Sequence, residues 1–433
     1  MTLHAFRGSV LHYLEDPATH AEQASEFIDD ALLLVEDGKI KALAPYAELI
    51  PTLDPALKVI DYSGKILMPG FIDLHTHYPQ TEMIASYGRQ LLDWLNNYTF
   101  PTESKFADAA YAKSIAELFI DELLRNGTTT AMVFATVHKA SAEAFFEVAA
   151  AQNLRMIAGK VLMDRNAPAT LCDTVDTGYT ESAELIEKWH GKQRLSYAVT
   201  PRFAPTSTPE QLQSAGQLLQ AYPGVYLQSH LAENRDELAW VAELFPKARD
   251  YLDAYEQAGL LGPHCVYAHG IHLSDSACDR LAQSGTVLAH CPTSNLFLGS
   301  GLFEMNRLSK QGVRYAIGTD VGAGTSFSMF RTLGDAYKIQ QLQQHSLHPH
   351  QSLYLATLGG ARALSMDHLI GNFLPGKEAD FIVIDPQSTP LLSFRTAQCE
   401  SLTEMLFALT TLGDDRLIHA TYILGNLAYL QEH

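Results

Sequence analysis

Two histidines at alternate positions end an apolar run, where both side chains could bind one metal ion. The run reads FIDLHTH, and its histidines are His75 and His77. Side chains alternate along a β-strand, so the two imidazoles would point to the same face. An H-x-H pair alone is also compatible with two unrelated polar residues, so it needs support from elsewhere in the chain.

Three other apolar runs also end in side chains that can bind a metal. His230 ends the first, His269 the second and Asp320 the third, and Glu233 follows His230 by three residues. Neutral imidazole and carboxylate ligands suit Zn²⁺ or Fe²⁺ and can leave one coordination position open for water. Each residue could be structural by itself, but four such strand ends in one chain indicate a functional metal site.

The elements expected to position these residues alternate along residues 68–372. Apolar runs predict strands over 71–77, 130–134, 156–162, 195–199, 225–228, 265–268, 286–289 and 315–318. Helical patterns lie between them, over 109–126, 140–152, 208–222 and 236–245. About eight strand–helix units, with no G-x-G-x-x-G after a strand, favour an α/β fold of the (β/α)8, TIM-like barrel type over a doubly wound sheet. In such a barrel the carboxyl ends of the strands face the ligand.

Both ends of the chain carry strand and turn signals instead. An apolar run at 31–35 meets the turn signal Asp37-Gly38, and a short strand at 59–61 meets a second turn signal at 63–65. Strands at 381–385 and 420–424 repeat this pattern near the carboxyl terminus. We therefore expect residues 1–67 and 373–433 to form one small β-sandwich domain, and residues 68–372 to form the catalytic barrel.

Composition excludes several classes of protein. The chain has 433 residues with 30 Lys+Arg and 49 Asp+Glu, a net charge of −19, which disfavours binding to nucleic acid or to an anionic membrane. Hydrophobic residues make up 47%, enough for a large core. Five scattered cysteines without a C-x-x-C fit a reducing compartment. With no signal peptide and no apolar run of about 18 residues, a cytoplasmic protein is predicted.

The order of these motifs resembles the amidohydrolase superfamily. A Pro-Gly-Phe-Ile-Asp leader precedes H-T-H at 69–77, and the lone histidines and a Thr-Asp pair follow. This resemblance covers almost the whole chain and implies a metal-bearing barrel with a small β-sandwich made by both termini. No lysine ends the fourth barrel strand, which runs into Thr200-Pro201-Arg202. That departs from the branch whose carboxylated lysine bridges two metals, so a mononuclear site is implied.

Further segments are similar to those of guanine deaminases within this superfamily. They lie at 75–80, 91–95, 98–103, 200–205, 230–234 and 290–295. Gln80, Arg202-Phe203 and the Asp93-Trp94-Leu95 segment narrow the resemblance to that family. It implies hydrolytic deamination of guanine, a purine small-molecule substrate, to xanthine and ammonia in purine catabolism or salvage. It also implies a homodimer.

The resemblance implies a role for each residue of the metal centre. His75, His77, His230 and Asp320 would hold one divalent metal, zinc first and iron as the alternative, because both ions suit such ligands. A bound metal would lower the pKa of a water toward about 7, and Asp320 would accept its proton. His269 would hydrogen-bond the same water and stabilise the developing oxyanion.

Other residues would handle the substrate. Glu233 would act as the general acid toward a ring nitrogen, although a glutamate in the first turn of a helix is also common. Gln80 and Arg202 would read the polar edge of the ring, and Phe203 and Trp94 would stack on it, with Glu233 and His269 also in contact. Alternatively, Arg202 forms a surface ion pair and the two aromatic residues belong to the core.

Several alternatives stay open. One is a deaminase or chlorohydrolase for a triazine, pterin or pyrimidine; another is a non-catalytic, amidohydrolase-like assembly protein. A cytidine-deaminase zinc site needs H-x-E with P-C-x-x-C, and Cys291-Pro292 runs in the opposite order. No role is assigned to His272. The tract of His345, His348 and His350 has no nearby carboxylate in the sequence, so no metal site is assigned to it. The 91–103 segment is a candidate for closing over the substrate.

Overall fold

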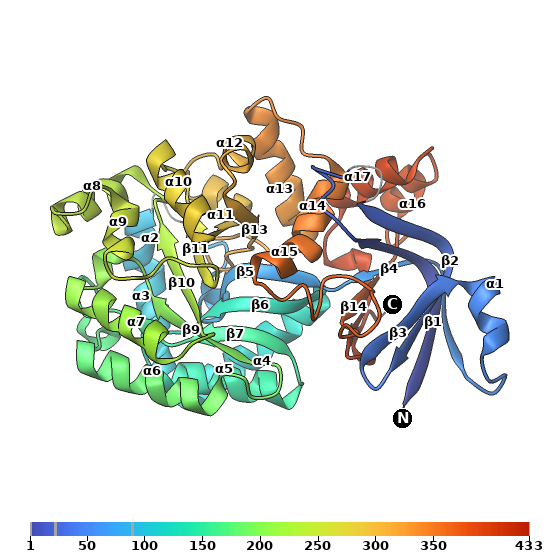
Figure 1. The fold of residues 1–433 in the computed structure, drawn as a ribbon, viewed down its shortest axis with the longest axis horizontal. Helices are drawn as coiled ribbons and strands as arrows, with labels where there is room; N and C mark the ends of the chain where they lie inside the picture. Colours follow the sequence, from blue (N-terminus) through green and yellow to red (C-terminus); the bar gives the residue numbers. More distant parts are fainter. Residues whose placement is uncertain (1, 21–23, 88–90, 433) are drawn as a thin grey trace.

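The two ends of the chain pair into one seven-stranded mixed sheet, as expected (Figure 1). The computed structural model describes residues 2–20, 24–87 and 91–432. The sheet order is β16-β15-β14-β4-β1-β2-β3, and β4 pairs antiparallel with β14, so that Pro69 lies opposite Phe381. The strands are β1 (Leu3–Tyr13), β2 (Ser25–Glu36), β3 (Lys39–Pro45), β4 (Val59–Pro69), β14 (Phe381–Ile384), β15 (Ile418–Ile423) and β16 (Asn426–Leu430).

Turn chemistry explains how this sheet folds back on itself. Asp37 and Gly38 both have positive φ values, 48° and 81°, which matches the two-residue hairpin between β2 and β3. The turn predicted at 63–65 is wrong: these residues lie within β4, where the pairing of β1 and β4 shifts register. Ser63 donates from its backbone N–H to Asp61 at 2.8 Å, so the local signal produces an irregularity and not a chain reversal.

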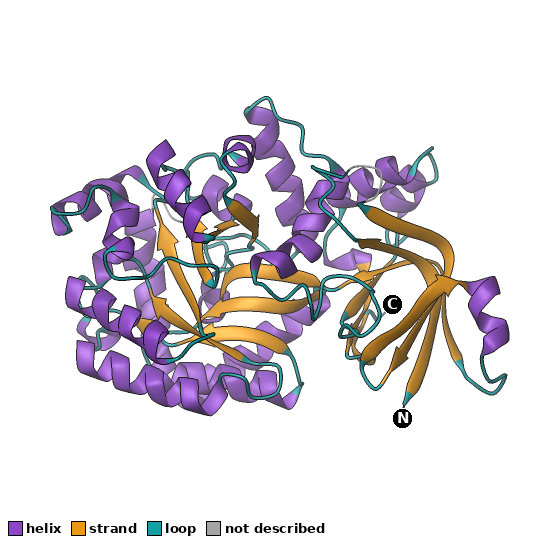
Figure 2. Ribbon diagram, in the orientation of Figure 1, coloured by secondary structure: helices purple, strands orange, loops and turns teal. Residues whose placement is uncertain are grey.

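Eight parallel strands form a nearly closed barrel, with helices around its outside (Figure 2). Their order is β13-β12-β11-β10-β9-β7-β6-β5, and the two-residue β8 (Val161–Leu162) pairs with β9. The strands are β5 (Phe71–His77), β6 (Thr128–Phe134), β7 (Arg155–Gly159), β9 (Ser196–Pro201), β10 (Tyr226–Leu231), β11 (Cys265–His269), β12 (Val287–His290) and β13 (Arg314–Ile317).

Asp73 joins the two edges of the barrel, at β5 and just after β13. Its carboxylate accepts the backbone N–H of Thr319 at 2.9 Å and that of His75 at 3.1 Å. The backbone N–H of Asp320 donates to the carbonyl of His75 at 2.8 Å. The ends of β5 and β13, which carry His75 and Asp320, are therefore held together.

The predicted helices occur within about one residue of their expected limits, well inside the usual uncertainty of helix ends. They are α4 (Ala109–Arg125), α5 (Lys139–Ala151), α7 (Pro209–Ala221) and α8 (Arg235–Leu244). The other helices of seven or more residues are α6 (Val175–Trp189), α10 (Asp275–Ser284), α13 (Met329–Leu342), α14 (Pro349–Leu355), α16 (Pro390–Thr396) and α17 (Leu402–Leu412).

Two features bear on the expected organisation. α17, which follows residue 372, packs against α13, which precedes it, and β4 continues without a break past residue 67. The domain limits at 67/68 and 372/373 therefore stay predictions.

Within the described part of the chain, no helix combines the length and apolarity that crossing a bilayer requires.

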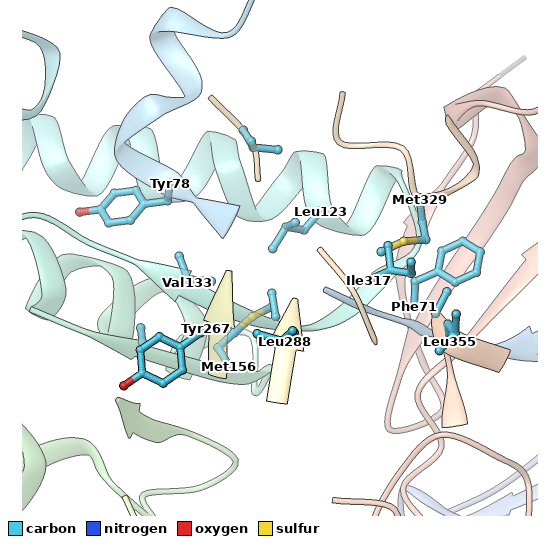
Figure 3. Close-up of a cluster of buried hydrophobic side chains, with 14 of the residues drawn as sticks. Phe71, Tyr78, Leu123, Val133, Met156, Tyr267, Leu288, Ile317, Met329 and Leu355 are labelled. Carbon is cyan, nitrogen blue, oxygen red and sulfur yellow. The ribbon is translucent and has the colours of Figure 1, made fainter. Parts of the chain in front are cut away.

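The core lies between the barrel strands and their helices (Figure 3). Phe71, Val133, Met156, Tyr267 and Leu288 are among its fully buried members. Every residue of β5 and β6 is buried, as expected for parallel strands covered on both faces. Burial of each large apolar side chain contributes about 1.5–3 kcal/mol, which stabilises the scaffold that carries the residues at its rim.

Candidate metal-dependent active site

The four predicted metal ligands meet at the carboxyl end of the barrel. His75 and His77 come from β5, His230 from β10, and Asp320 follows β13; their ligand atoms all lie within 4.8 Å of one another. His77 Nε2 is 3.1 Å from His75 Nε2 and 3.3 Å from His230 Nε2. Asp320 Oδ1 lies 3.2 Å from His75 Nε2 and 3.3 Å from His77 Nε2.

The chemistry of this donor set fits a divalent cation. His230 Nδ1 donates to the backbone carbonyl of Arg202 at 2.7 Å, so its Nε2 lone pair is directed at the cluster. Burial lowers the pKa of His77 to about 4, which keeps the imidazole in the neutral form that binds metals. Burial opposes ionisation of Asp320, but the charge of His75 and hydrogen bonds from the imidazoles hold its pKa well below the usual value.

A second possible grouping shares Asp320 with His269 and Cys291. Burial raises the pKa of the Cys291 thiol well above its usual value, and the nearby carboxylates of Asp320 and Asp73 add to this effect. A thiol must lose its proton to be a strong metal ligand, so the four-residue cluster is the better site for one ion.

The backbone is unusual where these strands end. Ala232, His269 and Asp320 have φ values of 51°, 73° and 52°, the left-handed region that residues with a Cβ rarely adopt. Each such residue costs about 1 kcal/mol or more and persists only where its surroundings hold it. Clustering of three of them beside one cavity is typical of a functional site.

Glu233 and His269 lie side by side next to the cluster. His269 Nε2 is 3.3 Å from Glu233 Oε2 and 3.9 Å from Asp320 Oδ2. The amide nitrogen of Asn295 donates to His269 Nδ1 at 2.9 Å, which places the proton of the neutral ring on Nε2, and burial lowers the pKa of His269 to about 3. The Ser300 hydroxyl donates to Glu233 Oε1 at 2.8 Å.

Glu233 is in an environment that favours a protonated carboxyl group. Burial raises its pKa well above the usual value, and the charges of Glu237 and Asp320 raise it further, against the hydrogen bond from Ser300. Glu237 also fixes the loop: its Oε2 accepts the backbone N–H of Glu233 at 2.9 Å and of Asn234 at 3.0 Å.

A cavity of about 420 Å³ opens onto the cluster. All residues predicted to contact the substrate line it: Gln80, Trp94, Arg202, Phe203, Glu233 and His269. Trp94 also belongs to a buried apolar cluster and donates its indole N–H to the carbonyl of Ser86 at 3.3 Å, so the core interpretation holds for it as well.

The ion pair of Arg202 is buried and not at the surface. Arg202 Nη1 donates to Glu103 Oε2 at 2.7 Å, and both side chains are almost fully inaccessible. Gln80 Nε2 donates to the other carboxylate oxygen of Glu103 at 3.1 Å. Glu103 therefore joins two residues of the cavity wall, a contact that the sequence did not predict.

The remaining histidines of interest make structural contacts. His272 Nε2 donates to the carbonyl of Ser300 at 2.9 Å, which supports the residue that contacts Glu233. His348 caps the amino end of α14, and His350 lies between Tyr13 and Thr403.

Four residues of the site escaped prediction for different reasons. Glu103 and Asn295 lie inside segments that carry the family resemblance, so those segments offered a signal. Glu237 could have been recognised as the N3 residue of a capping box that begins at Asn234. Ser300 lies in an irregular loop and reaches Glu233 across 67 residues of sequence, and no local pattern marks it.

A parallel barrel with a buried His/Asp cluster at its carboxyl rim, joined to a sheet built from both termini, defines the class of the protein. The sequence pattern of the Amidohydrolase family matches residues 66–428, and the chain belongs to this family of metal-dependent hydrolases.

Particular relatives match over nearly their whole length. The chain is 51% identical to guanine deaminase of Escherichia coli (strain K12) over 431 residues, which cover 99% of this chain and 98% of that protein. The solved structure of the E. coli guanine deaminase superposes with a TM-score of 0.97 at 50% identity, covering 99% and 100% of the two chains. A guanine deaminase from C. acetobutylicum, solved with guanine bound in its active site, gives a TM-score of 0.89 at 31% identity, covering 99% and 100%.

Proposed function

We propose that this protein is a guanine deaminase, a hydrolase that replaces the exocyclic amine of guanine by oxygen to give xanthine and ammonia. The observation that carries this proposal is one cavity whose lining includes three residues of the metal-competent cluster (His77, His230 and Asp320), the Glu233–His269 pair, Gln80 and Arg202. The 51% identity to the E. coli guanine deaminase supports the choice of substrate, as does the relative that holds guanine in its active site.

In this proposal one divalent ion would be held by His75, His77, His230 and Asp320, with zinc as the first choice and iron as the alternative. Such an ion, when bound, lowers the pKa of a water toward about 7 and so supplies a nucleophile at neutral pH. Asp320 would accept a proton from that water on its carboxylate. The Nε2 proton of His269 orients the same water and then stabilises the negative charge that develops on the attacked ring.

Glu233 moves the proton that the leaving group needs. Burial favours the protonated form of its carboxyl group, which would donate to the ring nitrogen beside the amine-bearing carbon. Once water has added to that carbon, the Glu233 carboxylate would take up the proton held by Asp320 and pass it to the amine, and the C–N bond would then break to release ammonia. The hydroxyl proton of the adduct would return to Glu233 as the carbonyl of xanthine forms. Ser300 holds Oε1 of Glu233 during this transfer.

Four residues recognise the planar ring. Arg202 offers a fork of donors to a ring oxygen or nitrogen, and Gln80 completes the polar edge. Phe203 and Trp94 provide apolar surface for the faces of the ring. A mutation that displaces Arg202 or Gln80 would weaken binding of the ring and so raise KM, with a smaller effect on the chemical step at the amine-bearing carbon.

The alternatives are less well supported. A triazine, pterin or pyrimidine substrate would not account for the near full-length identity to guanine deaminases. A non-catalytic assembly protein would not need all four ligand positions filled next to a buried Glu233.

One experiment separates these possibilities. Purified protein is incubated with guanine and with a panel of triazine, pterin and pyrimidine amines, while mass spectrometry counts metal per chain. We expect the ultraviolet spectrum of guanine to convert to that of xanthine, with one divalent ion per chain. Turnover of another ring without turnover of guanine would contradict the substrate, and a chain that binds no stoichiometric metal would support the assembly protein.

We further propose a homodimer in the cytoplasm, with domain limits at 67/68 and 372/373. All five cysteines are free thiols, which supports a reducing compartment. Leu391 and Phe394 of α16 are 61% and 70% exposed, and apolar side chains at such a surface are compatible with a subunit contact. Sedimentation equilibrium at micromolar concentration tests the dimer: a single species of monomer mass would contradict it.

A further inference from the structure

Glu103 is a buried carboxylate that lies behind the wall of the cavity. It is the last residue of α3 (Phe100–Glu103) and is fully inaccessible. One carboxylate oxygen accepts Arg202 Nη1 at 2.7 Å, and the other accepts Gln80 Nε2 at 3.1 Å. A single side chain thus connects the two polar residues that come from the ends of β5 and β9.

This contact fixes the orientation of the Gln80 amide. A carboxylate can only accept hydrogen bonds, so the amide atom that faces Glu103 must be the NH₂ group. The carbonyl oxygen then lies beside Gly322, where an added Cβ would come within 2.1 Å of Gln80 Oε1. Gln80 lines the cavity, as do Asp320 and Ala323 near Gly322, and this carbonyl oxygen is the only acceptor that the amide can offer to a ligand there.

The ion pair between Glu103 and Arg202 also balances the positive charge of Arg202 in this wall of the cavity. The Arg202 side chain is only 3% exposed, and a buried guanidinium without a counter-ion would attract an anion into the cavity. Glu103 supplies that counter-ion through Nη1. The guanidinium has five N–H groups in a planar fork, so it keeps further donors beyond the bond to Glu103.

We propose that Glu103 is a positioning residue that determines specificity: it makes this wall select a neutral lactam edge over a purine anion. An acceptor on Gln80 beside donors on a charge-compensated Arg202 is complementary to a ring N–H beside a ring carbonyl. This inference rests on the proposed function, because it assumes that a purine occupies the cavity.

The test compares two purines that differ in charge. At mildly alkaline pH xanthine is mostly an anion and hypoxanthine is mostly neutral, and calorimetry gives the dissociation constant of each for the metal-loaded protein. In Glu103→Gln, which has nearly the same shape without the charge, we expect the affinity ratio to shift toward xanthine by about tenfold or more. A ratio within about twofold of the parent would overturn the proposal, since a charge change of this kind must exceed that range.

A second pair of variants repeats the test without the positive charge of Arg202. Arg202→Gln leaves the carboxylate of Glu103 alone, and Glu103→Gln/Arg202→Gln removes both charges. We expect the double variant to bind the xanthine anion better, relative to hypoxanthine, than Arg202→Gln does. Equal ratios in these two proteins would contradict the charge role even if Glu103→Gln does not fold.

A matched control and an independent readout complete the design. Glu184→Gln removes a carboxylate that pairs with Lys139 at the surface, and it should leave the ratio unchanged. Binding constants do not depend on turnover. Failure of the parent to deaminate guanine would therefore count against the proposed function, whereas an unchanged ratio counts against Glu103 alone.

Discussion

The pKa values of two carboxyl groups in the same cavity are shifted in opposite directions. Burial and the charge of Glu237 raise the pKa of Glu233, whereas the imidazoles around Asp320 lower its pKa in spite of burial. Groups separated in this way can serve as acid and base in one reaction. The strand-end pattern predicted Glu233, Asp320 and the three histidine ligands. It did not predict Ser300 or Glu103, because these residues lie outside that pattern and make their contacts across 67 and 99 residues of sequence.

Glu233→Gln tests the proton transfer. The amide keeps the size of the side chain but cannot supply the proton, so we expect the bound metal to stay and kcat to fall by about 10³-fold, within the usual range for a general acid. Steady-state kinetics on guanine and metal analysis of the same preparation measure both. Activity equal to that of the parent would show that Glu233 carries no essential proton.

At the scale of elements, apolar runs predicted all eight barrel strands, because most residues of these strands are buried and each strand shows as a short apolar stretch. Turn signals were less reliable. Asp37-Gly38 forms a hairpin, but the similar signal at 63–65 became an irregularity in β4, since β4 pairs with the same strand, β1, both before it at 59–61 and after it at 66–67. The left-handed backbone at His269 and Asp320 has no sequence signal, because neither is a glycine.

Glu237→Ala tests the element that carries Glu233. Glu237 caps α8 through two backbone N–H groups and accepts the Tyr251 hydroxyl at 2.7 Å. Loss of these buried bonds should lower the free energy of unfolding by about 1–3 kcal/mol and reduce turnover, because the loop of Glu233 loses its support.

Denaturant unfolding measures the change in stability. Glu243→Ala is the matched control, because Glu243 is an exposed residue of the same helix. It should change stability by less than about 0.5 kcal/mol. Equal effects of the two substitutions would argue against the capping role of Glu237.

At the scale of the whole molecule, a buried ion cluster links the segment at 378–380, which leads into β14 of the terminal sheet, to the barrel. Glu378 accepts Arg155 Nε at 2.8 Å and Arg194 Nε at 3.1 Å, and Asp380 also pairs with Arg194. The sequence predicted that both termini share a sheet. It could not predict this cluster, whose partners lie 184 or more residues apart.

Glu378→Gln tests this junction and its pH dependence. Burial opposes ionisation of Glu378, but its hydrogen bond from Arg155 and the charges of both arginines hold its pKa below 4.5. A carboxylate with a lowered pKa stabilises the fold above its unfolded pKa and loses that contribution as pH falls. The variant should therefore lose about 2 kcal/mol at neutral pH, and the difference from the parent should shrink as the pH falls below about 4.5.

Denaturant unfolding of both proteins across this pH range gives the comparison. A difference that stays constant between neutral and acidic pH would show that the ionised form of Glu378 is not what stabilises the junction.

The most direct test of the central claim is to count metal and follow guanine in the same sample. The parent protein and His75→Ala are each stripped with a chelator, then titrated with zinc while bound metal and xanthine formation are recorded. We predict that the parent regains activity in proportion to bound zinc up to one ion per chain, and that His75→Ala regains neither tight binding nor activity. Full guanine turnover by the metal-free parent would contradict the account.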